Sequence, residues 1–118
     1  MLVEEKLIDQ EIIDTCLIPL GDARGEVLDA YLSQMDEVVK KIILALDKND
    51  LTSIAKEAHS LKGASLQLGF HQIGTLARDI EDIAKGNEIY NEPNYPQLKL
   101  QLKLSYEATV SYIRKELL

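Results

Sequence analysis

The strongest pattern in the sequence lies between residues 22 and 48, where apolar side chains recur at alternating steps of four and three. They form one stripe along a single helical face: Leu28, Leu32, Met35, Val39, Ile42 and Leu46. The opposite face carries charged residues such as Asp36 and Lys40. This one-sided spacing is typical of an amphipathic helix. The pattern therefore predicts a long helix over residues 22–48.

Two more segments with helical spacing follow. The first has a stripe of Leu51, Ile54, Ala58, Leu61, Ser65 and Leu68, and the second has Ile73, Leu76, Ile80 and Ile83. Asn49 or Asp50 can cap the first helix, and Gly69 suits the left-handed position just past its end. Gly86 ends the second helix. Because the connection between them is short, these helices are predicted to be antiparallel neighbours.

The last segment can be interpreted in two ways. Alternate residues are leucine over part of it, which is a strand pattern: Leu98, Leu100, Leu102 and Leu104. However, the sequence has no second convincing strand to pair with it, and a lone strand is not stable. A helical face also continues through Leu98, Leu102, Tyr106, Thr109, Ile113 and Leu117. After a loop over residues 86–96 we therefore predict a helix to about Leu117, with Leu100 or Leu104 partly exposed.

The start of the chain predicts a shorter helix over residues 3–17. Leu7, Ile8, Ile12 and Cys16 lie there at helical spacing. Pro19 and Gly21 break this helix, which is expected to lie across a larger bundle. Cys16 is the only cysteine, so no intrachain disulfide can form and a reducing compartment is favoured. We expect Cys16 to be a small buried apolar residue.

These segments predict an all-α fold, an antiparallel up-down-up-down four-helix bundle with a short extra N-terminal helix. A chain of 118 residues can build one core but not two, so a single domain over residues 1–118 is expected. Aromatic residues make up only 5% of the chain, which favours helices over a β-sandwich.

The net charge of −7 argues against two classes of partner. Nucleic acids and anionic membranes select basic surfaces, so we predict binding to neither. The sequence also has no apolar run of roughly 18 residues and no signal-peptide pattern. We therefore expect a cytoplasmic protein.

One histidine stands apart from the apolar stripe of residues 51–68. With roughly 100° per residue, His59 lies roughly 130° from the centre of that stripe and is expected to be exposed. The other side chains of this face are small, apolar or basic: Thr52, Ala55, Lys56, Lys62, Gly63 and Leu66. No acidic residue of this face lies beside the imidazole. The presence of Gly63 needs an explanation, because glycine inside a helix lowers the stability of the helix by about 1 kcal/mol relative to alanine.

These residues would suit a histidine that carries a phosphoryl group. Imidazole forms covalent intermediates in catalysis. Lys62, one turn away, could offset the charge of a transferring phosphoryl group. Gly63 would leave room for the active site of a second protein. The docking surface around His59 would consist of Thr52, Ala55, Lys56 and Leu66.

Each of these residues also has a simpler interpretation. A lone exposed histidine is usually just a surface residue, the lysines could be ordinary solvated side chains, and a helical glycine can allow close packing. The combination is what favours a phosphoryl site. His71, the other histidine, is expected to be a surface residue or to neighbour a helix cap. A metal site is not expected, because His59 lacks a His, Asp or Glu three or four residues later.

The segment His59-Ser60-Leu61-Lys62-Gly63-Ala64-Ser65, followed by Leu68-Gly69, resembles the signature of histidine-containing phosphotransfer (HPt) domains. In that signature Leu-Lys-Gly begins two positions after the histidine, small residues come next, and a glycine follows ten positions after the histidine. The resemblance covers the whole chain in length and helix order. Ala64 stands where the family often has serine, and Phe70 where a smaller residue is common, which is expected to alter the packing between the two helices.

The resemblance implies a phosphorelay intermediate, which takes a phosphoryl group from the aspartate of one receiver domain and passes it to another. His59 would be phosphorylated, Lys62 would stabilise the phosphoryl group, and Gly63 would keep the approach open. The implied partners are receiver domains of hybrid sensor histidine kinases and response regulators. The receiver would bring magnesium, so no cofactor of the chain's own is expected. Because the sequence has no glycine-rich nucleotide loop, we expect a monomeric phosphocarrier without kinase activity.

Two other functions stay open for such a bundle. It could regulate a partner by binding alone, although a docking module would not need the nucleophile. It could instead be the dimerisation and phosphoacceptor helices of a histidine kinase, although four helices in one chain argue against an obligate dimer. Met1 and the complete helix count favour a free-standing protein over a piece of a hybrid kinase. Outside the His59 face, partners are expected to contact the helix of residues 22–48 around Tyr31 and Met35.

Overall fold

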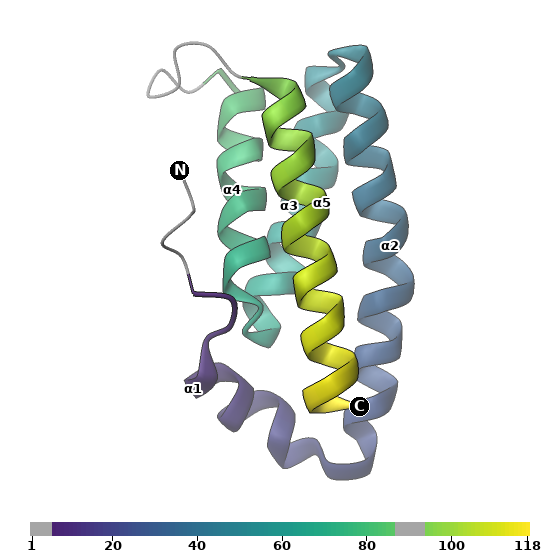
Figure 1. Cartoon of the computed structure of the whole chain (residues 1–118), viewed down its shortest axis with the longest axis vertical. Helices are drawn as coiled ribbons and strands as arrows, with labels where there is room; N and C mark the ends of the chain where they lie inside the picture. The colour runs from purple at the N-terminus through teal and green to yellow at the C-terminus, as the bar shows by residue number, and fades with distance from the viewer. Residues whose placement is uncertain (1–5, 87–93) are drawn as a thin grey trace.

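Four long helices form a bundle in which each helix runs antiparallel to the next along the chain (Figure 1). The computed structural model describes residues 6–86 and 94–118. The helices are α2 (Arg24–Lys48), α3 (Leu51–Leu68), α4 (His71–Ala84) and α5 (Tyr95–Tyr112). Every regular element within the described ranges is helical. The predicted all-α bundle is therefore confirmed.

The apolar stripe of α2 is buried along its whole length. Its six residues are at most 6% exposed: Leu28, Leu32, Met35, Val39, Ile42 and Leu46. The helix ends at Lys48, and the following residue Asn49 has a left-handed φ of 54°. Asp50 then caps α3, because its side chain accepts a hydrogen bond from the Ser53 amide at 3.2 Å. The long helix and the tight connection after it are thus confirmed.

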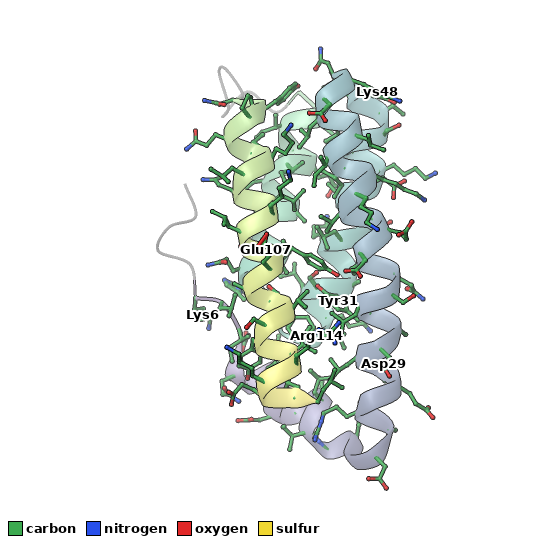
Figure 2. All side chains as sticks on the ribbon, turned by 45° about the vertical axis from the view of Figure 1, so that its right-hand side comes forward. Lys6, Asp29, Tyr31, Lys48, Glu107 and Arg114 are labelled. Atoms are coloured by element: carbon green, nitrogen blue, oxygen red, sulfur yellow. The ribbon has the colours of Figure 1, made fainter. Side chains whose placement is uncertain are left out.

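Tyr31 and Met35 belong to the core, so the expectation that they mark an exposed contact surface of α2 is wrong. Tyr31 is 4% exposed and Met35 is 5% exposed. The Tyr31 hydroxyl lies 2.7 Å from Ser65 Oγ, and the Tyr31 and Phe70 rings pack with centroids 4.9 Å apart. Figure 2 shows Tyr31 between the helices and Asp29 on the outer surface. The reason is that the buried face of α2 is wide enough to take in the residue beside the stripe.

The bounds of α3 agree with the prediction, and its stripe is buried except at the two ends. Leu51 is 44% exposed, contrary to the prediction, because it is the first residue of the helix. Leu68 is only partly buried. Gly69 ends α3 with a φ of +90°, and a Cβ at this position would lie 3.1 Å from the Asp9 carbonyl oxygen. Phe70 is fully buried in the connection to α4.

The N-terminal segment crosses one end of the bundle as a chain of short helices (Figure 1). They are α1 (Gln10–Ile12), the π-helical η1 (Ile13–Leu17) and the 3-10 helix η2 (Ile18–Ala23). The predicted helix over residues 3–17 is wrong at residues 6–9, which are not helical, and residues 3–5 lie outside the described residues. The Asp9 side chain caps α1, and the Asp9 backbone amide donates a hydrogen bond to the Gly69 carbonyl at 2.7 Å. Gly21, with a φ of 56°, makes the predicted break.

Cys16 is exposed, so its predicted burial is wrong. Ile13 and Leu17 are the buried residues of η1, at 1% and 0% exposure. The buried face of this segment therefore passes through Ile13 and Leu17, each one position after the predicted Ile12 and Cys16. Cys16, directly before Leu17, points away from the bundle.

The last segment is helical, as predicted. Asn94 caps α5 by accepting from the Gln97 amide at 3.0 Å, and the π-helical η3 (Ile113–Leu117) continues the helix to the predicted end. Leu100 and Leu104 are both exposed, at 56% and 57%. Residues 87–93 of the predicted loop lie outside the described residues. Within residues 6–86 and 94–118, no helix is long and apolar enough to cross a membrane.

Gly74 lets α3 and α4 approach closely. A Cβ at Gly74 would lie 2.5 Å from Leu66 Cδ2 and 2.7 Å from Leu66 Cγ. Overpacking of this kind costs about 1–3 kcal/mol, against a gain of about 1 kcal/mol from helix propensity. We therefore expect Gly74→Ala to lower the free energy of unfolding by about 1 kcal/mol, measured by urea denaturation.

The matched background for this test is Leu66→Ala, which removes the colliding atoms. In that background Gly74→Ala should cost nothing or stabilise the protein, because only the gain in helix propensity remains. If Gly74→Ala lowered the free energy of unfolding equally in wild type and in Leu66→Ala, Leu66 would not be the residue that Gly74 accommodates.

Candidate functional site

His59 lies in the middle of α3 with its side chain 67% exposed, as the helical wheel predicts. Gly63 follows one turn later and is also exposed. A Cβ built on Gly63 would meet no atom within 4 Å, so close packing within this chain does not explain the glycine. The structure thus provides an accessible imidazole beside an open stretch of helix.

A buried carboxylate from the neighbouring helix contacts this imidazole. Glu81 of α4 has a side chain only 3% exposed, and its Oε2 lies 2.9 Å from His59 Nδ1. The sequence reasoning missed this residue because it considered only the helix that carries His59. A signal was present, since Glu81 follows the stripe residue Ile80 and lies four residues after Ala77 on the apolar side of α4.

Two lysines also bind the Glu81 carboxylate. Lys62 Nζ lies 2.7 Å from Oε1, and Lys85 Nζ lies 2.8 Å from Oε2. The side chain of Lys62 is 28% exposed, whereas that of Lys85 is 61% exposed. Glu81 therefore joins the predicted site residues His59 and Lys62 to Lys85, which the sequence reasoning did not select. We call these four residues the Glu81 cluster.

The cluster fixes the ionisation of Glu81. Burial on its own raises the pKa of this carboxyl, but hydrogen bonds from Lys62, Lys85 and His59 outweigh burial and lower the pKa to about 2. An ionised carboxylate can only accept hydrogen bonds. His59 Nδ1 must therefore carry the proton that it shares with Glu81, which leaves the lone pair of Nε2 available.

This arrangement predicts a specific loss of stability in acid. Because the pKa of Glu81 falls from its ordinary value of 4.5 to about 2 on folding, its contribution is complete above pH 4.5 and is lost as the pH falls toward 2. At neutral pH, Glu81→Gln should lower the free energy of unfolding by about 1.5–3 kcal/mol, the range for hydrogen bonds to charged groups. Denaturant titrations at several pH values would measure this difference.

The control is Asp82→Asn, which removes the same charge one residue further along α4. The difference in the free energy of unfolding between wild type and Glu81→Gln should shrink as the pH falls below 4.5. The corresponding difference between wild type and Asp82→Asn should stay small at every pH. Parallel curves for wild type and Glu81→Gln would show that the cluster does not stabilise the ionised carboxylate.

The predicted docking residues lie along α3 on either side of His59. Thr52 and Lys56 are exposed, and Ala55 and Leu66 are half-buried. Leu66 also covers Gly74, so it has a packing role of its own. His71 is half-buried at the first position of α4. Among the residues that the structure describes, no three His, Cys, Asp or Glu side chains gather as a metal site would require.

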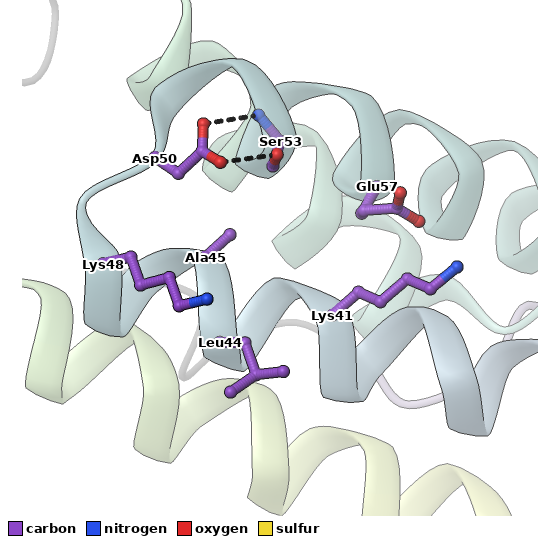
Figure 3. A pocket seen from close by; sticks show the side chains of 7 residues that line it. All are labelled: Lys41, Leu44, Ala45, Lys48, Asp50, Ser53 and Glu57. Atoms are coloured by element: carbon purple, nitrogen blue, oxygen red, sulfur yellow. Dashed lines mark hydrogen bonds between the residues drawn. The ribbon is translucent and has the colours of Figure 1, made fainter.

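A separate pocket lies between the end of α2 and the start of α3 (Figure 3). Side chains of both charges line it together with two apolar ones: Lys41, Leu44, Ala45, Lys48, Asp50, Ser53 and Glu57. Figure 3 shows the Asp50 carboxylate accepting hydrogen bonds from the Ser53 amide and hydroxyl at the start of α3. None of the Glu81 cluster lines this pocket, so it is not part of the histidine site.

Comparison with known families agrees with the geometry. Residues 26–111, most of the chain and all of the Glu81 cluster, match the family described as the Hpt domain. The chain belongs to the Hpt domain family. Among curated proteins, this Hpt domain is similar to the phosphorelay intermediate protein rdeA of Dictyostelium discoideum, with 28% identity over 99 residues. That match covers 83% of the chain but only 39% of rdeA, so the chain spans about two-fifths of its relative.

A solved structure has the same fold as this Hpt domain. Histidine-containing phosphotransfer protein B (HptB) of Pseudomonas aeruginosa PAO1 superposes with a TM-score of 0.82, at 20% sequence identity. The match covers 95% of both chains.

Proposed function

We propose that this Hpt domain accepts a phosphoryl group from a receiver-domain aspartate on His59 Nε2 and passes it to the aspartate of another receiver domain. The observation that carries the proposal is the exposed imidazole whose Nδ1 is bound by Glu81 at 2.9 Å. That contact orients the ring and leaves Nε2 as the nucleophile. Membership of the Hpt family and similarity to a phosphorelay intermediate support the same function.

Lys62 is proposed to stabilise the phosphoryl group, and the structure adds a condition to this role. In the unphosphorylated protein Lys62 is bound to Glu81, 2.7 Å from Oε1. A phosphoryl group on His59 would bring a second anion within reach of the same lysine. Lys62 would then lie between the two anions and pair with both.

The receiver domain is proposed to approach over Gly63 and to contact the docking residues Thr52, Ala55, Lys56 and Leu66. The lysines of this face suit an acidic receiver pocket, and opposite charges speed such encounters. The receiver would supply both the aspartate and the magnesium ion. On this proposal the Hpt domain is a monomeric, cytoplasmic phosphocarrier without kinase activity. Its partners would be the receivers of hybrid sensor histidine kinases and of response regulators.

The experiment is to incubate the purified protein with a receiver domain carrying radioactive phosphate. The Hpt domain should become labelled in an acid-labile, base-stable form, and the label should move on when a second, unlabelled receiver is added. ATP alone should not label it. A protein that binds receivers but never takes label would instead be the regulatory binding module, and labelling by ATP alone would contradict the carrier role. Light scattering should give the mass of a monomer, since a dimer would favour the histidine-kinase alternative.

A further inference from the structure

We propose that an outer surface formed by α2 and α5 is a docking site for an acidic amphipathic helix of another protein. Three exposed leucines lie there among lysines. We call this surface the α2–α5 face, and its residues are Lys40, Lys41, Leu44, Lys48, Lys99, Leu100, Lys103 and Leu104. None of them belongs to the Glu81 cluster, so the proposal goes beyond the phosphoryl site and does not depend on it.

The leucines of this face have no packing role inside the bundle. Leu44 and Leu100 are each 56% exposed, and Leu104 is 57% exposed. With roughly 100° per residue, Leu100 and Leu104 lie on the side of α5 opposite its buried stripe. The alternating leucines of the sequence therefore divide into two pairs, because Leu98 and Leu102 pack in or against the core and the other two face outward.

The packing of α5 on α2 brings the three leucines to neighbouring positions. Lys99 Nζ lies 2.7 Å from Asp47 Oδ1, which joins the two helices. Leu44 lies one turn before Asp47, Leu100 directly follows Lys99, and Leu104 comes one turn later. Single exposed apolar side chains are normal, but a group of them on two packed helices forms a patch of the kind that binds a partner.

The charge of the face is opposite to that of the whole chain. The chain has a net charge of −7, yet five of its 13 basic residues lie on this face. The nearby acids are already engaged: Glu37 with Lys40, Asp47 with Lys99, Asp36 with Tyr106 and Asp50 with Ser53.

Three lysines of the face are left without such a partner. Lys41, Lys48 and Lys103 make no ion pair with any residue that the structure describes. Glu57 and Glu107 lie at the margins of the face rather than among these lysines (Figures 2 and 3). A partner that brings carboxylates around an apolar stripe would therefore match both the charge and the leucines.

The shape of the face suits a helix. Leu100 and Leu104 are separated by one helical turn, or about 6 Å, which is the spacing of side chains along a partner helix laid beside α5. Beside Leu44 the surface is hollowed by the pocket of about 190 Å³, to which Lys41 and Lys48 also contribute (Figure 3). A helix can place a side chain into such a hollow, whereas a lipid surface is flat and, when anionic, repels an acidic chain.

The α2–α5 face and the phosphoryl site lie on different sides of the bundle. His59 projects from α3 beside α4, where it contacts Glu81. Because α5 packs against α2 and α4, it lies diagonally across the bundle from α3 (Figure 1). A helix bound to the α2–α5 face would therefore leave His59 open to a receiver domain.

The test uses a synthetic peptide of about 15 residues, with leucines at i, i+4 and i+7 and glutamates on its other face. Adding it to the full chain should shift the amide NMR signals of residues 40–48 and 99–104, with a Kd below about 1 mM. The affinity should fall as salt rises from about 50 mM to about 500 mM. A peptide with lysines in place of the glutamates should not bind. No binding of the acidic peptide, or shifts centred on His59, would overturn the proposal.

Variants of the face identify the residues responsible. Leu44→Gln and Leu100→Gln should each weaken peptide binding by about tenfold, and Lys103→Glu should weaken it by a similar factor. The matched controls are Leu20→Gln and Lys115→Glu, which change exposed side chains outside the face and should bind like wild type. Equal affinities for face and control variants would contradict the proposal. Circular dichroism checks folding, and the wild-type comparison of the two peptides decides the question for any variant that is unfolded.

Other occupants of the face would give different results. Preferential binding to vesicles of phosphatidylcholine and phosphatidylserine would make it a membrane contact. A dimer in light scattering that Leu100→Gln dissociates would make it an interface between two copies, and either result would overturn the proposal. Receiver-dependent labelling should proceed at the same rate with and without saturating acidic peptide. Loss of labelling only when the peptide is present would contradict the proposed placement, whereas no labelling in either case would refute the relay function alone.

Discussion

His59→Gln should take up no phosphoryl label from a phosphorylated receiver domain. The substitution removes the nucleophile, so transfer should fall by several orders of magnitude, to background. Glutamine keeps an amide that can donate a hydrogen bond to Glu81, and the His59 side chain is mostly exposed, so the fold should be retained. The measurement is the initial rate of label transfer, with circular dichroism to check folding.

His71→Gln is the matched control, because it makes the same chemical change at the only other histidine. It should transfer at the wild-type rate, since His71 is half-buried at the start of α4 and no part of the proposed site includes it. If His59→Gln still accepted label, the phosphoryl group would have to reside on another residue, and the assignment of the site would be lost.

Gly63→Gln should separate stability from function. Glycine is the poorest helix former after proline, so glutamine at this open, exposed position should raise the free energy of unfolding by up to about 1 kcal/mol. The long side chain would also occupy the space beside His59 that the receiver must enter. Displacing reacting groups by 1 Å can cost about 100-fold in rate, so we expect a loss of that size in label transfer. Urea denaturation and transfer kinetics would measure the two effects.

Gly25→Gln provides the control for this substitution. Gly25 lies in the first turn of α2, and a Cβ there would also meet nothing within 4 Å. The variant should be at least as stable as wild type and transfer normally, because the new side chain is far from the site in the chain and belongs to another helix. If Gly63→Gln transferred as fast as Gly25→Gln, the open space at Gly63 would have no role in access.

The helices could be predicted because their information is local. The stripe of α2, the caps at Asp50 and Gly69 and the buried face of α5 each depend on residues a few positions apart. The errors occur where that local rule changes. Cys16 is exposed because the buried face of its segment passes through Ile13 and Leu17, one position later than predicted. Residues 7–9 are not helical, and backbone hydrogen bonds hold Leu7 to Gln72 and Asp9 to Gly69, more than fifty residues away.

Half of the site could be predicted for the same reason. His59, Lys62 and Gly63 lie within two turns of one helix, so the wheel places them correctly. Glu81 belongs to α4 and Lys85 directly follows that helix, and the approach of Glu81 to His59 depends on how α3 and α4 pack. No spacing within α3 contains that information. A buried acid next to an apolar stripe is the signal that could have led to them, because such an acid needs cationic or hydrogen-bonding partners.

The close approach of α3 and α4 at Gly74 has a consequence for anyone who wishes to transplant this site. The nucleophile and its carboxylate come from two helices, and Leu66 over Gly74 sets how near those helices lie. Grafting the α3 signature alone onto another scaffold would give an exposed histidine with an unselected tautomer. The smallest portable unit is therefore the α3–α4 hairpin with its glycine contact. A designer would need to copy the spacing between the helix axes as faithfully as the residues themselves.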